Sequence, residues 1–433
     1  MKAVSPAVLE NLSPAMTAVV AAAEGRLEGP LQQLRGRPEW QRLWLASDYA
    51  LTIALREPLA AVALDEAITS EDIADYSLLL SDPMADADEA TFMRWLRQQR
   101  QREMLRWIWR DVNGWCTVQQ LTRELSDFAD ASIELALRRA HAELVARHGE
   151  PVGEESGTPQ RLCVIAMGKL GAQELNLSSD IDLIFAYPEA GETAGPAVIS
   201  NQEFFVRLGQ KVIRLLDTQT ADGFVFRVDM RLRPSPEVSP IVLPVEAAIG
   251  YYESSALAWE QAAFIRSRVS SGDRALGDYF LHAIQPFIWR KSLDFGQLKN
   301  ITAMTAQIRD HYAKGQKMGL GFDLKRGHGG IRECEFFAQA HQLIHGGRDP
   351  VLRVPDTREA LQRLAAAGPI SPQEADTLSS AYEQLRTFEH RLQMHSDRQT
   401  HEIPANRDTA DAVARLHGLA DADALIAAIQ PIT

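Results

Sequence analysis

The chain has 433 residues, of which 45% are hydrophobic and 24% charged, and its formal net charge is −13. This composition is typical of a soluble globular protein with two or three domains. Because proteins that bind nucleic acid usually present a basic face, the acidic balance argues against nucleic-acid binding. The three cysteines show no zinc-ligand spacing, and no stretch approaches the roughly 18 apolar residues of a membrane helix. We therefore expect a cytoplasmic protein with reduced thiols and no membrane partner.

The first 150 residues are predicted to form a helical region, because Ala, Leu, Arg and Glu recur there at helical spacing. The clearest helix covers 91–111, where Phe92, Leu96, Met104 and Ile108 share one face and six arginines occupy the remainder. We interpret this segment as a packed helix with solvated arginines. The alternative is a basic amphipathic helix that docks on an acidic partner.

A small mixed α/β region is predicted next, over residues 151–245. Gly, Pro and acidic residues in HGEPVGEESGTPQ (148–160) mark the boundary that precedes it. Strand and helix patterns then alternate, with strands at 161–168, 180–187 and 224–234 and a helix at 203–220. This order predicts a sheet of few strands with helical cover.

Helical periodicity returns at about Val245, so residues 246–433 are predicted to form a helical domain. The glycine-rich segment GHGGIRE (327–333) interrupts the periodicity and predicts a close backbone approach at a helix start. The fold class is therefore α+β, predominantly helical, with a small mixed sheet flanked by helical regions. Because the last residues, DADALIAAIQPIT, stop within a helical pattern without capping residues, we expect the chain to be part of a longer protein.

Two acids one residue apart are the first candidate for chemistry, in the segment SSDIDLIF (178–185). On a strand Asp180 and Asp182 point to the same face, while Ile181, Leu183 and Phe185 point to the core. Two carboxylates this close raise each other's pKa unless a cation compensates. Mg²⁺, which prefers hard oxygen ligands, would resolve the conflict.

A third acid, Asp229, falls in FRVDMRLRP on the next predicted strand. Alternation places Arg227, Arg231 and Arg233 on the same face as Asp229. Acids for two metal ions together with guanidinium groups are what phosphoryl-type transfer requires. A solvated strand edge is the alternative for a lone pair of acids, but three acids with arginines on two neighbouring strands favour a site. Upstream, Gly168 and Lys169 of MGKLG lie at a strand end where backbone amides and an ammonium could approach phosphate.

These segments resemble a known family. GKLGAQELNLSSDIDLIF, DGFVFRVDMRLRP, YYESSALAWEQAAFIRSR and GHGGIRECEFFAQ occur in the order typical of the glutamine synthetase adenylyltransferase/adenylyl-removing family, and the resemblance covers roughly residues 90–400. This family is a branch of the DNA polymerase beta-like nucleotidyltransferases. Two positions depart from its pattern: Gln261 stands where Arg is usual, and Cys334 where an aliphatic residue is common.

The resemblance implies a function. Family members resemble two tandem modules, of which the N-terminal one removes AMP from a tyrosine of glutamine synthetase by phosphorolysis, releasing ADP, and the C-terminal one attaches AMP from ATP. The signature begins about 160 residues after Met1, and PFIWRKSLDFGQLKNI and LIHGGRDP look more like the first module. We therefore expect a deadenylylase that acts on adenylylated glutamine synthetase and phosphate. The resemblance also implies Mg²⁺ (two ions, with Mn²⁺ as an alternative) and regulation by the PII signalling protein.

The resemblance also assigns roles to residues. Metal binding and catalysis fall to Asp180, Asp182 and Asp229, while nucleotide or phosphate contacts fall to Gly168, Lys169, Ser178, Ser179, Arg231 and Arg233. Two other functions stay open. One is ATP-dependent adenylylation of glutamine synthetase, which the same acids would serve, and the other is a catalytically silent nucleotide-sensing module.

A few other residues carry weaker signals. His341 and His345 have the i, i+4 spacing of metal ligands but lack the glutamate of a zinc protease motif, so we expect no metal there. For His328 and Glu333, a position near the cleft competes with packing and ion pairing. The same alternatives stand for Glu335 and Glu260. Trp259 has a site role and a helix-packing role as equal alternatives.

Overall fold

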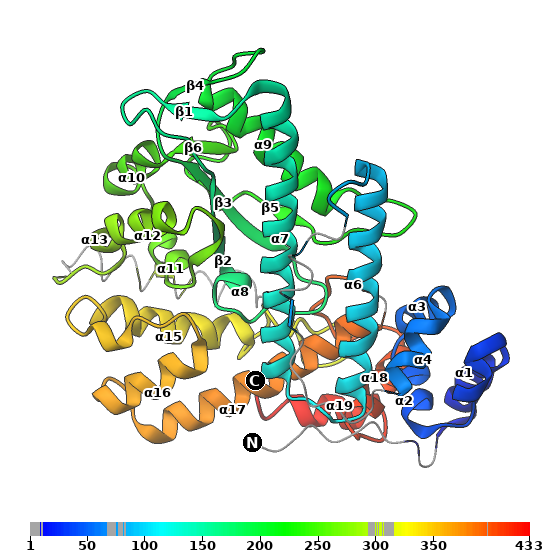
Figure 1. The fold of residues 1–433 in the computed structure, drawn as a ribbon. Helices are drawn as coiled ribbons and strands as arrows, with labels where there is room; N and C mark the ends of the chain where they lie inside the picture. Colours follow the sequence, from blue (N-terminus) through cyan, green and yellow to red (C-terminus); the bar gives the residue numbers. More distant parts are fainter. Residues whose placement is uncertain are drawn as a thin grey trace.

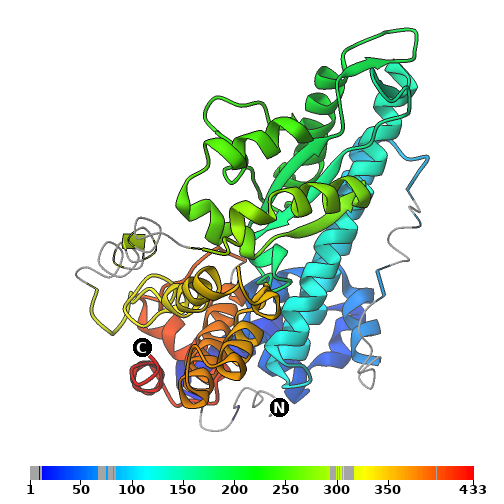
Figure 2. The same ribbon diagram turned by 90° about the vertical axis from the view of Figure 1, so that its left-hand side faces the viewer.

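The computed structural model describes residues 9, 12–66, 75–76, 81, 84–292, 299, 301, 303–304, 306, 316–395 and 397–433. It shows a sheet domain standing on a helical body, with the long helix α7 (Val118–His148) running along both (Figures 1 and 2). At 1.5 Å per residue, the 31 residues of α7 span about 46 Å. The predicted fold class, α+β with a small mixed sheet, is confirmed.

The N-terminal region is helical, as predicted. Its described elements are α1 (Pro14–Gly25), the 3₁₀ turn η1 (Gly29–Leu34), α2 (Pro38–Ala46), α3 (Asp48–Arg56), α4 (Pro58–Glu66), α6 (Glu89–Val112) and α7. Side-chain caps fix the starts of the longest helices. Asp88 accepts a hydrogen bond from the amide of Thr91, and Thr117 forms a reciprocal capping box with Gln120.

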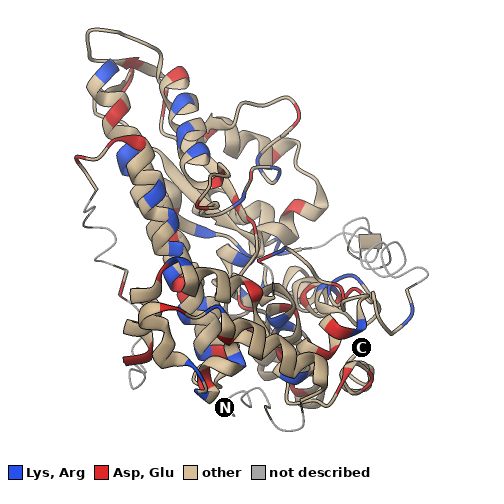
Figure 3. Cartoon of the chain, turned by 90° about the vertical axis from the view of Figure 1, so that its right-hand side faces the viewer, with Lys and Arg blue, Asp and Glu red and all other residues tan. Residues whose placement is uncertain are grey.

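The arginines of α6 are not all solvated, contrary to the sequence-based interpretation. Arg97, Arg100 and Arg110 are buried. Arg97 donates to the carbonyls of Leu215 and Gly223, and Arg100 forms two 3.0 Å contacts with the Asp397 carboxylate. A buried guanidinium is tolerated when its donors are satisfied, and here remote segments supply the acceptors. In the view of Figure 3, acidic and basic residues are interspersed along the helices.

The main sheet has five strands: β2 (Cys163–Met167), β3 (Ile181–Tyr187), β5 (Val228–Asp229), β6 (Val242–Pro244) and β7 (Arg268–Gly272). The order is β5-β3-β2-β7, and β6 pairs with the far end of β3. Strand β2 is antiparallel to β3 and to β7, whereas β5 and β6 are parallel to β3. β1 (Pro151–Gly153) and β4 (Gly191–Thr193) form a separate antiparallel pair.

The predicted strand at 224–234 is wrong over most of its length, because β5 contains only Val228 and Asp229. The Asp229 carboxylate accepts a 2.8 Å hydrogen bond from the backbone amide of Arg231, a side-chain turn that ends the strand. The prolines that follow, starting with Pro234, cannot donate to a sheet. β7 was missed because RVSSG is short, polar and surrounded by helical patterns.

Both faces of the sheet are covered. On one face Ile181, Leu183 and Phe185 share a core with α9 (Asn201–Asp217), as the alternation predicts. On the other face Ile184 and Ala186 pack in a core to which Phe336 and Leu343 contribute and which is formed mainly by four more helices. These are α10 (Val245–Ser254), α11 (Ala258–Ile265), α12 (Arg274–Ala283) and α13 (Gln285–Ile288).

The later helices complete the helical body. They are α15 (Ile331–His345), the 3₁₀ turn η2 (Pro350–Leu352), α16 (Thr357–Ala367), α17 (Pro372–Met394), α18 (Arg407–Leu416) and α19 (Ala422–Ile429). The prediction for GHGGIRE is confirmed, since Gly330 precedes α15 and a side chain at Gly327 would collide with Phe322. α17 packs against the N-terminal helices through a fully buried ion pair, in which Arg391 Nε lies 2.9 Å from Asp111 Oδ2. None of the described helices is long and apolar enough to cross a membrane.

Candidate active site

Three acids meet at one end of the sheet. Asp182 on β3 lies directly opposite Asp229 on β5 in the parallel register, and Asp180 stands immediately before β3. The prediction that the second acidic segment pairs beside the first is confirmed. The two-residue strand β5 is just long enough to bring its carboxylate to this edge.

The central acid of the three, Asp182, forms no ion pair with any described residue, although the charges of Lys325 and Arg231 partly offset the negative charge around it. Arg227 Nε lies 2.6 Å from Asp180 Oδ1, and Arg231 Nε lies 2.8 Å from Asp229 Oδ2. No described side chain donates a hydrogen bond to Asp182. Burial, together with the charges of Asp229 and Asp180, raises the pKa of Asp182 to about 7.

This donor set fits a hard cation. In the conformation described, no three His, Cys, Asp or Glu side chains among the placed residues are close enough to ligate one ion together. Mg²⁺ needs only one or two carboxylates, since water and phosphate oxygens complete its shell. Asp182 offers an unpaired carboxylate, and the Arg231 side chain that contacts Asp229 is 84% exposed. The crowding of negative charge around Asp182 is what a bound cation would relieve.

The turn after β2 approaches the acids closely. Gly168, the first residue of α8 (Gly168–Gly171), has a φ of 58°, and a Cβ there would lie 2.9 Å from Asp182 Oδ2. Only glycine suits both the backbone conformation and the space. Lys169 points elsewhere, because its Nζ lies 2.8 Å from Glu389 Oε1 on α17. The structure thus brings Gly168 to the acids but engages the Lys169 ammonium in the helical body.

Of the other residues that the sequence assigned to phosphate binding, some lie at the acids and others are directed away from them. Ser178 and Ser179 are buried in the turn before β3, where the Ser178 amide donates to Gln393 Oε1 at 3.1 Å. Arg231 reaches the acids. The Arg233 guanidinium turns into its own loop and donates to the carbonyls of Met230 (2.8 Å), Pro236 (2.5 Å), Ser239 (3.2 Å) and Pro240 (3.3 Å). The prediction that the arginines share a strand face with Asp229 is therefore wrong, because the strand ends at Asp229.

A buried polar network lies behind the Gly168 turn, and of its members only Glu335 was singled out from the sequence. It joins Glu174, Asn176, Arg266, Glu335, Tyr382, Arg386 and Glu389. Arg266 binds Glu174 and lies 2.6 Å from Glu335 Oε1. Burial would raise the pKa of Glu335, but the charges of Arg266 and Arg386 outweigh it and lower that pKa to about 2. Burial would also raise the pKa of Glu389, but Lys169 and His401 outweigh this effect, so the pKa of Glu389 is well below its usual range. One feature of the sequence could have predicted this network. On α17 the charged residues Arg386 and Glu389 lie on the same buried face as Leu385, Phe388 and Leu392.

The weaker candidates are also placed. The His341 and His345 rings stack at 6.0 Å, and no third ligand joins them among the placed residues. His328 is exposed, with Nδ1 3.8 Å from Glu333 Oε1. Glu260 caps its own helix by accepting from the Leu257 amide at 2.6 Å.

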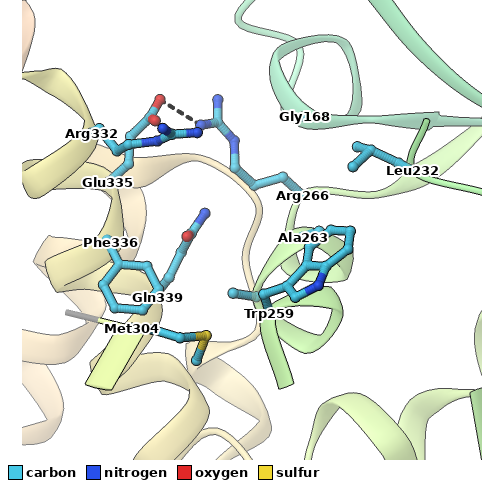
Figure 4. Close-up of a pocket in the computed structure, with 11 residues that line it drawn as sticks. Gly168, Leu232, Trp259, Ala263, Arg266, Met304, Arg332, Glu335, Phe336 and Gln339 are labelled. Carbon is cyan, nitrogen blue, oxygen red and sulfur yellow. Dashed lines mark hydrogen bonds and ion pairs between the residues drawn. The ribbon is translucent and has the colours of Figure 1, made fainter. Parts of the chain in front are cut away.

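A cavity of about 450 Å³ opens beside the acids, between α11 and α15 (Figure 4). Its lining residues are Gly168, Leu232, Trp259, Ala262, Ala263, Arg266, Met304, Arg332, Glu335, Phe336 and Gln339. Gly168 is the link between this cavity and Asp182. The cavity therefore adjoins the acids at this glycine.

An α+β domain with three acids at paired strand ends, a glycine-rich turn against them and helices across the cleft defines a nucleotidyltransferase. Residues 41–283 match the family model described as "Glutamate-ammonia ligase adenylyltransferase", and the chain belongs to this family. Residues 302–428 match a second model, described as "GlnD PII-uridylyltransferase".

Three curated relatives, each named "Bifunctional glutamine synthetase adenylyltransferase/adenylyl-removing enzyme", are similar over most of the chain. The protein from Thioalkalivibrio sulfidiphilus is 45% identical over 370 residues, covering 84% of this chain and 37% of the relative. Those from Pseudomonas aeruginosa (42% identical; 94% and 42% covered) and Xanthomonas axonopodis (38% identical; 97% and 44% covered) match similarly. The chain thus spans about two fifths of the length of these relatives.

Proposed function

We propose that this chain removes AMP from an adenylylated tyrosine of glutamine synthetase by phosphorolysis, yielding ADP and the free tyrosine. The observation that carries the proposal is the meeting of Asp180, Asp182 and Asp229 beside a cavity large enough for a nucleotide. The removing direction is supported by PFIWRKSLDFGQLKNI and LIHGGRDP, which resemble the AMP-removing module of the family.

In the proposed reaction an oxygen of orthophosphate attacks the phosphorus of adenylyl-tyrosine, and the bond from phosphorus to the tyrosyl oxygen breaks. The tyrosyl oxygen leaves with the bonding electron pair and takes up a proton from solvent. A phenol has a pKa of about 10, so the phenolate is a better leaving group than an alkoxide. The residues of this chain need mainly to position the two phosphate groups and to neutralise their charge.

Divalent cations belong to the proposal. Asp180, Asp182 and Asp229 would hold Mg²⁺, with Mn²⁺ as an alternative, and the cation would supply charge neutralisation for the phosphate oxygens. Arg231, exposed at the edge of the acids, is placed to exchange its contact with Asp229 for one with phosphate. The backbone at Gly168 allows phosphate to approach the acids without meeting a side chain.

The proposal also includes a regulatory partner, a PII signalling protein. It is supported by the match of residues 302–428 to a PII-uridylyltransferase model. This region contributes α15 and α17, whose side chains Glu335 and Glu389 contact Arg266 and Lys169 next to the site. A partner bound to these helices would therefore act on residues that adjoin the acids.

The test uses glutamine synthetase labelled on its tyrosine with radioactive AMP. We expect release of labelled ADP that requires both orthophosphate and Mg²⁺, and no release by the Asp182→Asn variant. Release of label as AMP without phosphate would show hydrolysis instead. ATP-dependent labelling of unmodified synthetase, with release of pyrophosphate, would show the transferase direction and overturn the proposal.

A further inference from the structure

The cavity beside the acids has walls of two kinds. Trp259 and Ala263 of α11 face Phe336 of α15 across it, and Gln339 of α15 points into the space between them (Figure 4). Phe336 is buried, whereas Trp259 is 43% exposed although a large aromatic side chain usually gains by burial. Its indole is therefore available to cover one face of a flat group.

The polar end of the cavity contains one side-chain amide, that of Gln339, without a hydrogen-bond partner among the described residues. Glu335 is engaged by Arg266 at 2.6 Å. Gln339, one turn further along α15, makes no hydrogen bond or ion pair with any described residue. An amide side chain presents a donor and an acceptor side by side. This is the pair that matches the N6 donor and N7 acceptor of adenine.

The position of the cavity decides which part of an adenylyl-tyrosine would enter. Gly168 lines the cavity and also faces Asp182, so the cavity is near enough to receive one substituent of a phosphate held at the acids. The two ring systems attached to that phosphate differ at their edges. The tyrosyl ring has a single polar atom, which is already esterified, and would leave the Gln339 amide unsatisfied. A purine has a polar edge opposite its sugar.

We propose that this cavity is the adenine-binding site, with the base between Trp259 and Phe336 and its N6–N7 edge on the amide of Gln339. The inference rests on the proposed function for the identity of the nucleotide. The volume of about 450 Å³ lies within the range of small-molecule sites, about 300–1,000 Å³. Apart from Trp259, the residues that α11 contributes to the lining are the small Ala262 and Ala263.

The direct test is binding of ADP, measured by calorimetry in the presence of Mg²⁺. Trp259→Ala is expected to raise the Kd for ADP about tenfold, the usual effect of losing one stacked aromatic side chain. Trp259→Phe should restore most of the affinity, because it restores an aromatic face. Trp115→Ala is the matched control: Trp115 is 40% exposed, like Trp259, but lies outside the cavity, so its loss should leave the Kd unchanged.

Gln339 is tested by base selectivity. Inosine diphosphate replaces the N6 donor with an acceptor, so the unmodified protein should bind ADP more tightly than IDP. Gln339→Leu should remove most of this preference, whereas Gln210→Leu, on the exposed side of α9, should retain it. Circular dichroism confirms that each variant is folded.

The outcomes separate this inference from the proposed function. Unchanged ADP affinity in folded Trp259→Ala, with unchanged selectivity in Gln339→Leu, would overturn the adenine site even if phosphorolysis is observed. Loss of affinity and of selectivity in a protein that does not release ADP from adenylylated synthetase would support the site and overturn the function.

Discussion

Gln399 Nε2 donates a 3.1 Å hydrogen bond to Oδ2 of Asp180, while Arg227 Nε holds Oδ1 of the same carboxylate at 2.6 Å. The two contacts fix both oxygens of one acid. Gln399 belongs to the segment after α17, which is anchored to α6 by the ion pair of Asp397 with Arg100. The orientation of an acid on the sheet therefore depends on the helical body.

The first prediction concerns this contact. Because Gln399 is exposed, Gln399→Leu should leave the melting temperature nearly unchanged. It should nevertheless raise the Mg²⁺ concentration needed for half-maximal phosphorolysis about tenfold, since groups that orient a metal-binding carboxylate typically have effects of this size. Titration of activity and of Mg²⁺ binding measures the effect. Gln384→Leu, an exposed glutamine of α17, is the control, and equal Mg²⁺ dependence in both variants would contradict the prediction.

The second prediction concerns pH and Asp182. In the folded protein the pKa of Asp182 is raised from 3.8 to about 7, so between these values the folded state keeps a proton that the unfolded chain releases. The contribution of Asp182 to the free energy of unfolding is therefore greatest below about pH 4 and is lost as pH rises through about 7. Asp182→Asn should abolish activity yet stabilise the metal-free protein at pH 8 by roughly 2 kcal/mol.

Thermal unfolding at pH 5 and pH 8 measures this effect. The stabilisation by Asp182→Asn should be clearly larger at pH 8 than at pH 5. Added Mg²⁺ should stabilise the unmodified protein at pH 8 more than the variant. A variant less stable than the unmodified protein at pH 8 without metal would show that Asp182 is not electrostatically strained.

The third prediction separates two arginines that the sequence treats alike. Arg231 is exposed, and among the described residues its guanidinium forms hydrogen bonds with the Asp229 side chain alone. Arg231→Gln should therefore reduce phosphorolysis about tenfold or more and change stability by less than about 0.5 kcal/mol. Arg233 donates to four loop carbonyls, so Arg233→Gln should destabilise the protein by about 1–3 kcal/mol. Paired kinetic and denaturation measurements check the contrast, and an inverted pattern would contradict both assignments.

The fourth prediction concerns the buried pair behind the site. Glu389 is fully buried and accepts from Lys169 and Asn176, so Glu389→Gln leaves a buried ammonium without its counter-charge. We expect a loss of about 3–5 kcal/mol in the free energy of unfolding. Glu383→Gln on the same helix breaks only the exposed ion pair with Arg358 and should cost at most about 1 kcal/mol. Urea denaturation of the two variants provides the comparison, and equal midpoints would refute it.

The sequence by itself determined the features that depend on local spacing. Strand alternation predicted Ile181, Leu183 and Phe185 in the core, and the structure confirms that placement, with Asp182 on β3 and Asp180 immediately before it. The helical pattern at 91–111 likewise became α6. These predictions succeeded because a side-chain direction within one element follows from its backbone period.

Only the tertiary structure decided which remote groups meet. It added β7 to the sheet, directed Lys169 to Glu389 instead of the acids, and buried three arginines of α6. Lys169, Arg97 and Arg100 each meet a partner more than 100 positions away. A buried charge is tolerated only beside a suitable partner, and the chain pattern around one residue does not specify which distant residue packing will place there.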